Sequence, residues 1–468
     1  MIRLPRRYQG APGAAGPLLY LEHTPHVMLG EWVTLRAPGQ PARRGQVIDA
    51  GERLTVVQVL EDTVGLAPAA TEVELTAEIA SVAVGRELLG RTLNGVGRPL
   101  DGLPAPVGEA RQPVWGAPIN PARRLPPADF IETGISAIDG MNTLVRGQKL
   151  PVFSGPGLPA LELAAQVVEF ARAPKGEPFA VVFVAIGITA RETRLFLDRF
   201  ARSGALARSV LYLNEASDPT IERLLAPRVA LAGAEFLAFE AGMHVLVVIA
   251  DMTHYCEALR ELATAREEVP GRRGFPGYLY TDLASIYERA GVVEGREGSL
   301  TQLPILTVPD DDITHPIADL TGYITEGQII LSRELHRLGI YPPITPLRSL
   351  SRLMNDGIGK GRTREDHGGL RDQIYSTYAN GVDLRKLVAI IGEEALTDRD
   401  RLYLKFSEEF EKQFLNQGHT ERGIEETLNL AWKLLSAFPK GELKRVKQDH
   451  IDRYYFGELM EETWKERL

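Results

Sequence analysis

Four apolar runs of strand length constrain the fold of this chain more than any other feature. Amphipathic helical patterns separate them, and the runs are KLPVFSG (149–155), FAVVFVAIG (179–187), SVLYLN (209–214) and HVLVVIAD (244–251). A strand that lacks polar alternation is buried on both faces, which is typical of a parallel sheet covered by helices on both sides. From about residue 131 onward, the sequence therefore predicts an α/β domain.

The amino-terminal part of the chain has a different pattern. Up to about residue 75, short Val- and Leu-rich runs are separated by Gly, Pro and charged turns, which predicts a small β-barrel or sandwich. The stretch 90–127 is rich in Gly and Pro and is unsuited to long helices. We expect it to cross between domains in an extended form.

The last hundred residues predict helices. One helix should begin near Thr397 and end before Gly418, and the next should be closed by Pro439 and Gly441. Their apolar stripes, which we assign to the core of a helical bundle, are Leu402, Phe406, Phe410 and Phe414, then Ile424, Leu428 and Leu435. The predicted domains are a β-barrel over 1–75, an α/β domain over 76–363 and a helical domain over 364–468.

Composition argues against several classes of protein. The 53 Lys and Arg against 62 Asp and Glu give a net charge of −9, which disfavours general binding to a nucleic-acid backbone. Cys256 is the single cysteine, so no internal disulfide or Cys-based zinc cluster can form, and a reducing compartment such as the cytosol is expected. No apolar run approaches the ~20 residues of a membrane span, and the first residues lack an apolar signal core. We expect any membrane role to be exerted from outside the bilayer.

The segment after the first apolar run has the layout of a P-loop without its chemical groups. It consists of Ser154, Gly155, Pro156, Gly157, Leu158, Pro159, Ala160 and Leu161, and a helical pattern follows. Against G-x-x-x-x-G-K-[ST], Pro159 takes the second Gly position, Ala160 the Lys position and Leu161 the Ser/Thr position. The loop therefore lacks an ammonium for the phosphates, a hydroxyl for Mg²⁺ and one N–H donor. We expect weak nucleotide binding or none, and no metal site.

Asp251 is the candidate for the second half of such a site. It ends the run HVLVVIAD, where a Walker-B carboxylate would lie, but an alternative alignment gives that position to Ala250. Asp251 could equally cap the strand end. Cys256, in the helix that follows, is interpreted as a buried apolar residue.

Longer motifs resemble a known family. They are FSGPGLPALELAAQ (153–166), ALRELATAREEVPGRRGFPGYLYTDLASIYERAG (258–291), TQLPILTVPDDDITHPIADLTGYITEGQIILSREL (301–335) and LRSLSRLMNDGIGKGRTREDH (347–367). With them, the chain resembles the B subunit of V/A-type rotary ATPases over essentially its whole length. The first motif is similar to the degenerate loop of that subunit, as opposed to the intact P-loop of its A subunit partner.

The resemblance implies a β-barrel, a central RecA-like domain of the P-loop NTPase type and a helical bundle. It implies a non-catalytic, regulatory subunit that alternates with the catalytic A subunit in a ring and also contacts central and peripheral stalk subunits. Such a ring couples ATP synthesis or hydrolysis to ion translocation from the cytoplasmic face of a membrane. Mg-ATP or Mg-ADP would be held at the interface with the A subunit, and this chain would have no cofactor of its own.

Arg352 lies where the family places an arginine finger. A guanidinium donates rigid, multidentate hydrogen bonds to phosphate oxygens and stays charged, so the resemblance implies that Arg352 completes the site of the A subunit in trans. Four further basic residues of this segment are expected to form interface salt bridges or to be solvated, and they are Arg348, Lys360, Arg362 and Arg364.

Two other segments carry clustered charges. Asp310, Asp311 and Asp312 with His315 have ligand types that suit Mg²⁺ or Ca²⁺, but a solvated acidic turn is the simpler interpretation. The resemblance places this turn toward the central stalk. The basic loop 270–274 is expected to touch a neighbouring subunit.

Two alternative functions are compatible with this architecture. An autonomous hexameric RecA-like NTPase, such as a helicase or export motor, needs its own Lys and Mg²⁺-binding hydroxyl, and this loop has neither. The α subunit of F-type ATP synthases is close in architecture but normally keeps an intact P-loop. A fold by itself does not distinguish these functions.

Overall fold

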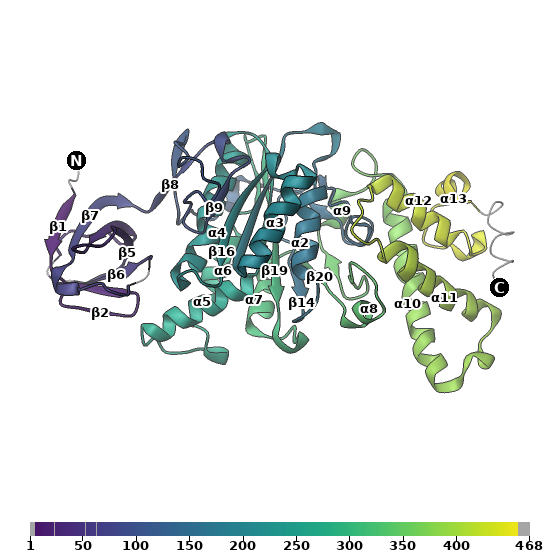
Figure 1. Ribbon diagram of the computed structural model, residues 1–468. Helices are drawn as coiled ribbons and strands as arrows, with labels where there is room; N and C mark the ends of the chain where they lie inside the picture. The colour runs from purple at the N-terminus through teal and green to yellow at the C-terminus, as the bar shows by residue number, and fades with distance from the viewer. Residues whose placement is uncertain (1–4, 23, 52, 62, 457–468) are drawn as a thin grey trace.

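The computed structural model describes residues 5–22, 24–51, 53–61 and 63–456, which form a β domain, a central α/β domain and a helical domain in a row (Figure 1). Some predictions extend beyond these residues. The apolar runs that contain His23 and Asp62, and the predicted domains at their 1–4 and 457–468 ends, lie partly outside the described part of the chain.

The β domain is one curled antiparallel sheet in the order β1-β7-β4-β5-β6-β3-β2. Its strands are β1 (Arg6–Gln9), β2 (Gly13–Ala15), β3 (Leu18–Glu22), β4 (Glu31–Arg36), β5 (Arg43–Ala50), β6 (Leu54–Val59) and β7 (Glu72–Ile79). Alternate residues along the strands, such as Leu19 and Leu21 of β3 or Val73 and Leu75 of β7, are buried in a core that belongs to this domain alone. This alternation, with a period of two, closes the sheet around its apolar face, and the predicted small barrel is confirmed.

The central sheet is mainly parallel. Its principal order is β21-β20-β14-β19-β17-β15-β16-β9, and β21 alone runs antiparallel to its neighbour along this path. The strands are β9 (Thr92–Asn94), β14 (Val152–Ser154), β15 (Phe179–Ile188), β16 (Ser209–Glu215), β17 (His244–Ala250), β19 (Ser299–Thr307), β20 (Gly327–Ile330) and β21 (Leu350–Ser351). The four apolar runs supply β14 to β17, as the sequence predicts.

Helices cover both faces of this sheet. The core on one face contains residues of α2 (Ala160–Phe170) and α3 (Ala190–Ser203), and the core on the other contains residues of α4 (Thr220–Glu235), α5 (Met252–Ala265) and α6 (Leu279–Tyr287). Along β15, Phe183 belongs to the first core, whereas Val182 and Val184 belong to the second. Burial on both faces explains why these strands have no polar alternation.

The Gly- and Pro-rich stretch 90–127 does not simply cross between domains. It adds β9 to the edge of the central sheet, and β10 (Ala110–Pro113) and β11 (Arg124–Leu125) pair with β8 (Ser81–Val84) and β18 (Gly291–Val293). Short strands joined by tight turns satisfy the backbone where long helices are disfavoured. The stretch therefore belongs to the central domain.

The helical domain contains α10 (His367–Ile391), α11 (Asp398–Glu409), a wider turn over Phe410–Leu415, α12 (Ile424–Leu435) and α13 (Gln448–Tyr454). Thr397 caps α11 in a capping box with Asp400, which confirms the predicted start of that helix. The stripe residues Phe406, Phe410 and Phe414 are buried, and consecutive rings stack on one another. None of the helices among the described residues is long and apolar enough to cross a bilayer.

Candidate functional site

The degenerate loop connects β14 to α2. Ser154 ends the strand and Ala160 begins the helix, and Gly157 adopts a φ of +78°, in the left-handed region that favours glycine. The N–H of Leu158 donates to the carbonyl of Gly155 at 3.2 Å, and that of Ala160 donates to Leu158 at 2.8 Å. Because two prolines carry no N–H and two other donors are bonded within the loop, it offers far fewer donors to a phosphate than a P-loop does.

An ion pair lies across this loop. Asp311 accepts two hydrogen bonds from Arg333, from Nε and Nη2, at 2.8 Å each, and Arg333 Nη2 also donates to the carbonyl of Pro156 at 3.0 Å. Asp311 follows β19 and Arg333 begins α8 (Arg333–Arg337) after β20, and these two strands flank β14. The Arg333 guanidinium holds the pKa of the Asp311 carboxyl below its usual value.

The residues of the loop do not fit Mg·ATP. A Cβ added at Gly155 would lie 1.6 Å from Asp311 Oδ1, so the carboxylate already fills the space beside the backbone at the start of the loop. Ala160 and Leu161 supply neither the ammonium nor the hydroxyl that phosphates and Mg²⁺ require. No catalytic step follows from this loop.

Asp251 is committed to the fold through both of its carboxylate oxygens. Oδ1 accepts from the N–H of Thr253 at 2.7 Å and caps α5, and Oδ2 accepts from the N–H of Thr307 at 2.9 Å at the end of β19. The strand β17 ends at Ala250, one residue earlier. The capping role is therefore directly visible, and contact of Asp251 with a nucleotide stays a prediction.

Arg352 is exposed at the edge of the sheet. Its backbone N–H donates to the carbonyl of Glu326 at 3.0 Å, and its guanidinium has no hydrogen-bond or ion-pair partner in the described part of the chain. Glu326 in turn pairs with Lys149 ahead of β14, whereas the loop starts beyond the other end of that strand, at Gly155. At about 3.3 Å per residue, this separation is roughly 20 Å. Arg352 cannot reach the loop of its own chain.

The basic residues near Arg352 have different environments. Arg364 pairs with the buried Asp366 at 2.6 Å and with Glu425 at 3.2 Å, so it holds the helical domain together. Arg348, Lys360 and Arg362 are exposed. Arg364 therefore forms its salt bridges within its own chain and not at an interface, and interface contacts of the three exposed residues stay a prediction.

The two charged loops bind each other. Arg273 pairs with Asp312 at 3.0 Å and Arg272 with Asp319 at 3.2 Å. Hydrogen bonds from Thr314 and Arg273 lower the pKa of Asp312 to about 2. His315 caps α7 (Pro316–Ile324), and no group of three or more His, Cys, Asp or Glu side chains in the described residues could hold a metal ion. Contact of these loops with another subunit stays a prediction.

Sequence reasoning missed Arg333. The available signal was its position three residues after the apolar strand β20, because neighbouring parallel strands bring their carboxyl ends to the same edge of a sheet. The same rule brings Asp311 to that edge from β19. The pairing of the two side chains could not be read from their spacing along the chain.

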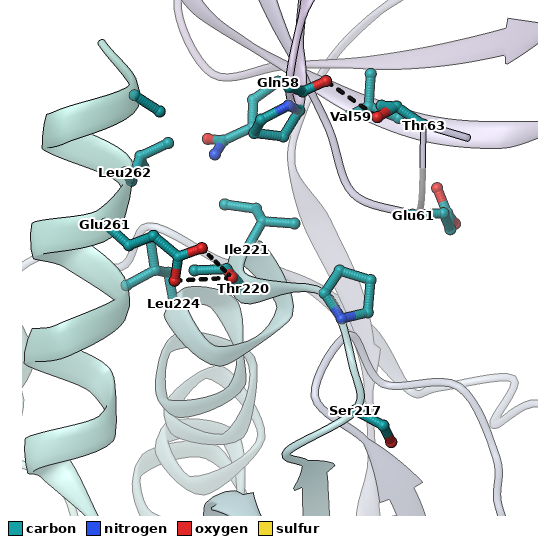
Figure 2. Close-up of a pocket in the computed structure, with 14 residues that line it drawn as sticks. Gln58, Val59, Glu61, Thr63, Ser217, Thr220, Ile221, Leu224, Glu261 and Leu262 are labelled. Atoms are coloured by element: carbon teal, nitrogen blue, oxygen red, sulfur yellow. Dashed lines mark hydrogen bonds between the residues drawn. The ribbon is translucent and has the colours of Figure 1, made fainter. Parts of the chain in front are cut away.

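A cavity of about 420 Å³ lies between the barrel and the central domain (Figure 2). Gln58, Glu61 and Thr63 line it from the barrel side, and Thr220 and Glu261 face them from α4 and α5, where the Thr220 hydroxyl donates to the Glu261 carboxylate. Apolar side chains line the floor of this cavity. This cavity is remote from the degenerate loop in the sequence, and it shares no lining residue with that loop.

A buried carboxyl near this junction makes stability depend on pH. Burial, reinforced by Asp218, raises the pKa of Glu222 to about 7, and one of its oxygens accepts from the N–H of Gly95 at 2.9 Å. A carboxyl whose pKa is raised in the folded state stabilises that state at low pH, and this contribution is lost as the pH rises through about 7.

We therefore expect Glu222→Gln to gain stability relative to the parent protein as the pH rises from 4.5 to 8. At 1.36 kcal/mol per pKa unit, the relative change should reach about 3 kcal/mol at most. Denaturant midpoints of both proteins, measured across this range, test the expectation. Midpoints that differ by a constant amount at every pH would show that Glu222 does not titrate differently on folding.

Comparisons with known proteins agree with this architecture. Residues 134–351 match the nucleotide-binding domain of the ATP synthase alpha/beta family, residues 13–77 match the beta-barrel domain of that family, and residues 356–455 match the C-terminal domain of V and A type ATP synthase. The chain belongs to the ATP synthase alpha/beta family.

Individual relatives narrow the assignment to the V and A types. The V-type ATP synthase beta chains of two Thermus thermophilus strains are each 60% identical over 472 residues, which cover 99% of this chain and 98% of theirs. The solved structure of the ATP synthase subunit NeqB from Nanoarcheaum equitans is 39% identical, with a TM-score of 0.72, and covers 90% of this chain and 100% of its own. The resemblance to the B subunit of V/A-type rotary ATPases is confirmed.

Proposed function

We propose that this chain is the non-catalytic, regulatory B subunit of a V/A-type ATP synthase or ATPase. It alternates with catalytic A subunits in a ring, contacts central and peripheral stalk subunits, and serves ion translocation from the cytoplasmic face of a membrane. Mg-ATP or Mg-ADP is held at the interface with the A subunit. The 60% identity to V-type ATP synthase beta chains supports this assembly.

The observation that carries the proposal is the position of Arg352. Its guanidinium is exposed and has no partner among the described residues, and it lies at the opposite end of β14 from the degenerate loop. An unpaired arginine that cannot serve its own chain is available to a neighbouring one. In that position it stabilises the negative charge that develops during phosphoryl transfer on the A subunit.

An autonomous NTPase is the second candidate, since the fold would permit it. The loop argues against an autonomous NTPase, because the side chains that would hold phosphates and Mg²⁺ are absent and Asp311 fills the space beside Gly155. No feature of the described residues favours the motor over the regulatory subunit.

The two functions predict different behaviour of the purified chain. We expect the chain alone to show no ATP turnover above the background of a mock purification, and the complex with a catalytic A subunit to turn over in the same buffer. A coupled ADP-release assay measures both. Turnover by the chain alone that disappears when the loop 154–161 is altered would identify it as a motor in its own right.

A further inference from the structure

The strongest unassigned feature is the ion pair between Asp311 and Arg333, which we call the clasp. It joins the carboxyl ends of three adjacent strands, because Asp311 comes from the turn after β19 and Arg333 from the start of α8 after β20, with the loop of β14 between them. In parallel sheets, this edge is where ligands bind. The clasp therefore spans the position that a phosphate-bearing ligand would have to enter.

Both members of the clasp lie directly against the loop. Both carboxylate oxygens of Asp311 are bonded to Arg333 at 2.8 Å, Arg333 Nη2 reaches the carbonyl of Pro156 at 3.0 Å, and Asp311 Oδ1 fills the space beside Gly155. An arginine beside a phosphate-type loop would otherwise be a phosphate ligand. In this structure, Nε and Nη2 of Arg333 donate to the carboxylate of Asp311 instead.

The backbone conformation at Asp311 indicates that specific contacts fix the position of this residue. Asp310 and Asp311 have φ values of +58° and +54°, in the left-handed region that is uncommon for residues other than glycine. Two consecutive residues in this region are held there by contacts elsewhere. Asp310 makes no side-chain hydrogen bond or ion pair with any other described residue, whereas Asp311 forms the clasp and Asp312 pairs with Arg273 at 3.0 Å.

We propose that Asp311 is a specificity-determining residue that excludes phosphate-bearing ligands from the degenerate loop. It does so by neutralising Arg333 and by holding a negative charge beside Gly155, where a phosphate would be repelled. This inference rests on the proposed function, because it explains how the regulatory subunit keeps its own loop silent. It adds a second barrier to the missing lysine and hydroxyl, one that the loop sequence does not show.

The test uses the full chain with the loop restored by Pro159→Gly, Ala160→Lys and Leu161→Thr, which provides a measurable signal. Binding of a fluorescent ADP analogue with Mg²⁺, and competition by pyrophosphate, are titrated with and without Asp311→Asn. Asp310→Asn is the matched control, since it removes the same charge one residue away and leaves the clasp intact.

The clasp is a partly exposed pair, so we expect Asp311→Asn to tighten binding about fivefold and Asp310→Asn to change it less than about twofold, because a competing contact reduces the apparent affinity by the fraction of protein that it closes. Equal effects of the two substitutions would show that the loss of a negative charge matters and the ion pair does not, which would overturn the proposal. Equal affinity with and without Asp311→Asn would overturn it as well.

A second measurement needs no restored loop. Hydrogen exchange over residues 152–162 of the otherwise unaltered chain should be about fivefold faster in Asp311→Asn and unchanged in Asp310→Asn, since the clasp then no longer holds the loop closed. Unchanged exchange in Asp311→Asn would contradict a closing role. ATP turnover by the isolated parent chain would refute the proposed function separately, without altering either comparison of the two aspartates.

Discussion

Replacing Arg352 by alanine should lower the ATP turnover of a reconstituted ring by roughly 10³-fold or more, the scale typical of a lost arginine finger. The guanidinium is exposed and unpaired within the described residues, so its loss should leave folding and ring assembly unchanged. Turnover is measured on rings whose composition has been checked by native mass spectrometry or gel filtration.

Two companion variants make this test specific. Arg352→Lys should rescue little, because an ammonium keeps the charge and loses the planar fork that bonds to two phosphate oxygens. Arg348→Ala removes an exposed arginine of the same segment and should retain turnover close to that of the parent. A ring that contains Arg352→Ala, assembles normally and works at the parental rate would show that this arginine is a bystander.

The second prediction with a large expected effect is a loss in the free energy of unfolding when Arg289 is replaced. This side chain is fully buried and forms a bidentate salt bridge with Glu235. Nε donates to Oε1 at 2.6 Å, and Nη2 donates to Oε2 at 2.7 Å. Its Nη1 also reaches the carbonyls of Val114 and Arg228. Arg289→Met would leave the Glu235 carboxylate, whose side chain is 19% exposed, without this partner, so we expect a loss of about 3 kcal/mol, at the lower end of the range for fully buried pairs.

Denaturant titration of the parent protein and Arg289→Met should show this loss in the transition of the central domain. Arg296→Ala is the matched control, because Arg296 pairs with Glu240 at 2.9 Å while both side chains are more than two-fifths exposed, and such pairs contribute about 1 kcal/mol at most. The double variant Arg289→Met with Glu235→Leu should recover most of the loss. Equal losses from the Arg289 and Arg296 substitutions would contradict a special role for burial.

Much of the fold could be predicted from local patterns. The runs that became β14 to β17 have no polar alternation because helices cover both faces of their sheet, and each run carries that information within its own residues. The capping box at Thr397 and the stripe of Phe406, Phe410 and Phe414 are likewise short-range features. The stretch 90–127 was expected to cross between domains in an extended form, and its strands β9, β10 and β11 instead pair with other strands, because strands as short as β9 are recognised by their partner in the sheet and have little pattern of their own.

In the candidate site, the chemical groups could also be predicted from the sequence, whereas the contacts between distant residues could not. The missing chemistry of the loop can be read directly from Pro159, Ala160 and Leu161, since a residue type fixes which groups are available. The role of Asp251 stayed open at the sequence level, and the structure shows its carboxylate capping α5 and bonding to Thr307. That second contact joins the ends of two strands, which no local pattern predicts.

Residue types along the chain thus establish an α/β domain between a barrel and a helical bundle, and a loop without the groups that bind phosphate. The folded chain adds the clasp between Asp311 and Arg333, the mutual pairing of the loops around Arg273 and Asp312, and the wide separation of Arg352 from its own loop. Each of these depends on which strands become neighbours. A parallel sheet brings residues that are distant in sequence to one edge, and their spacing along the chain carries no record of that proximity.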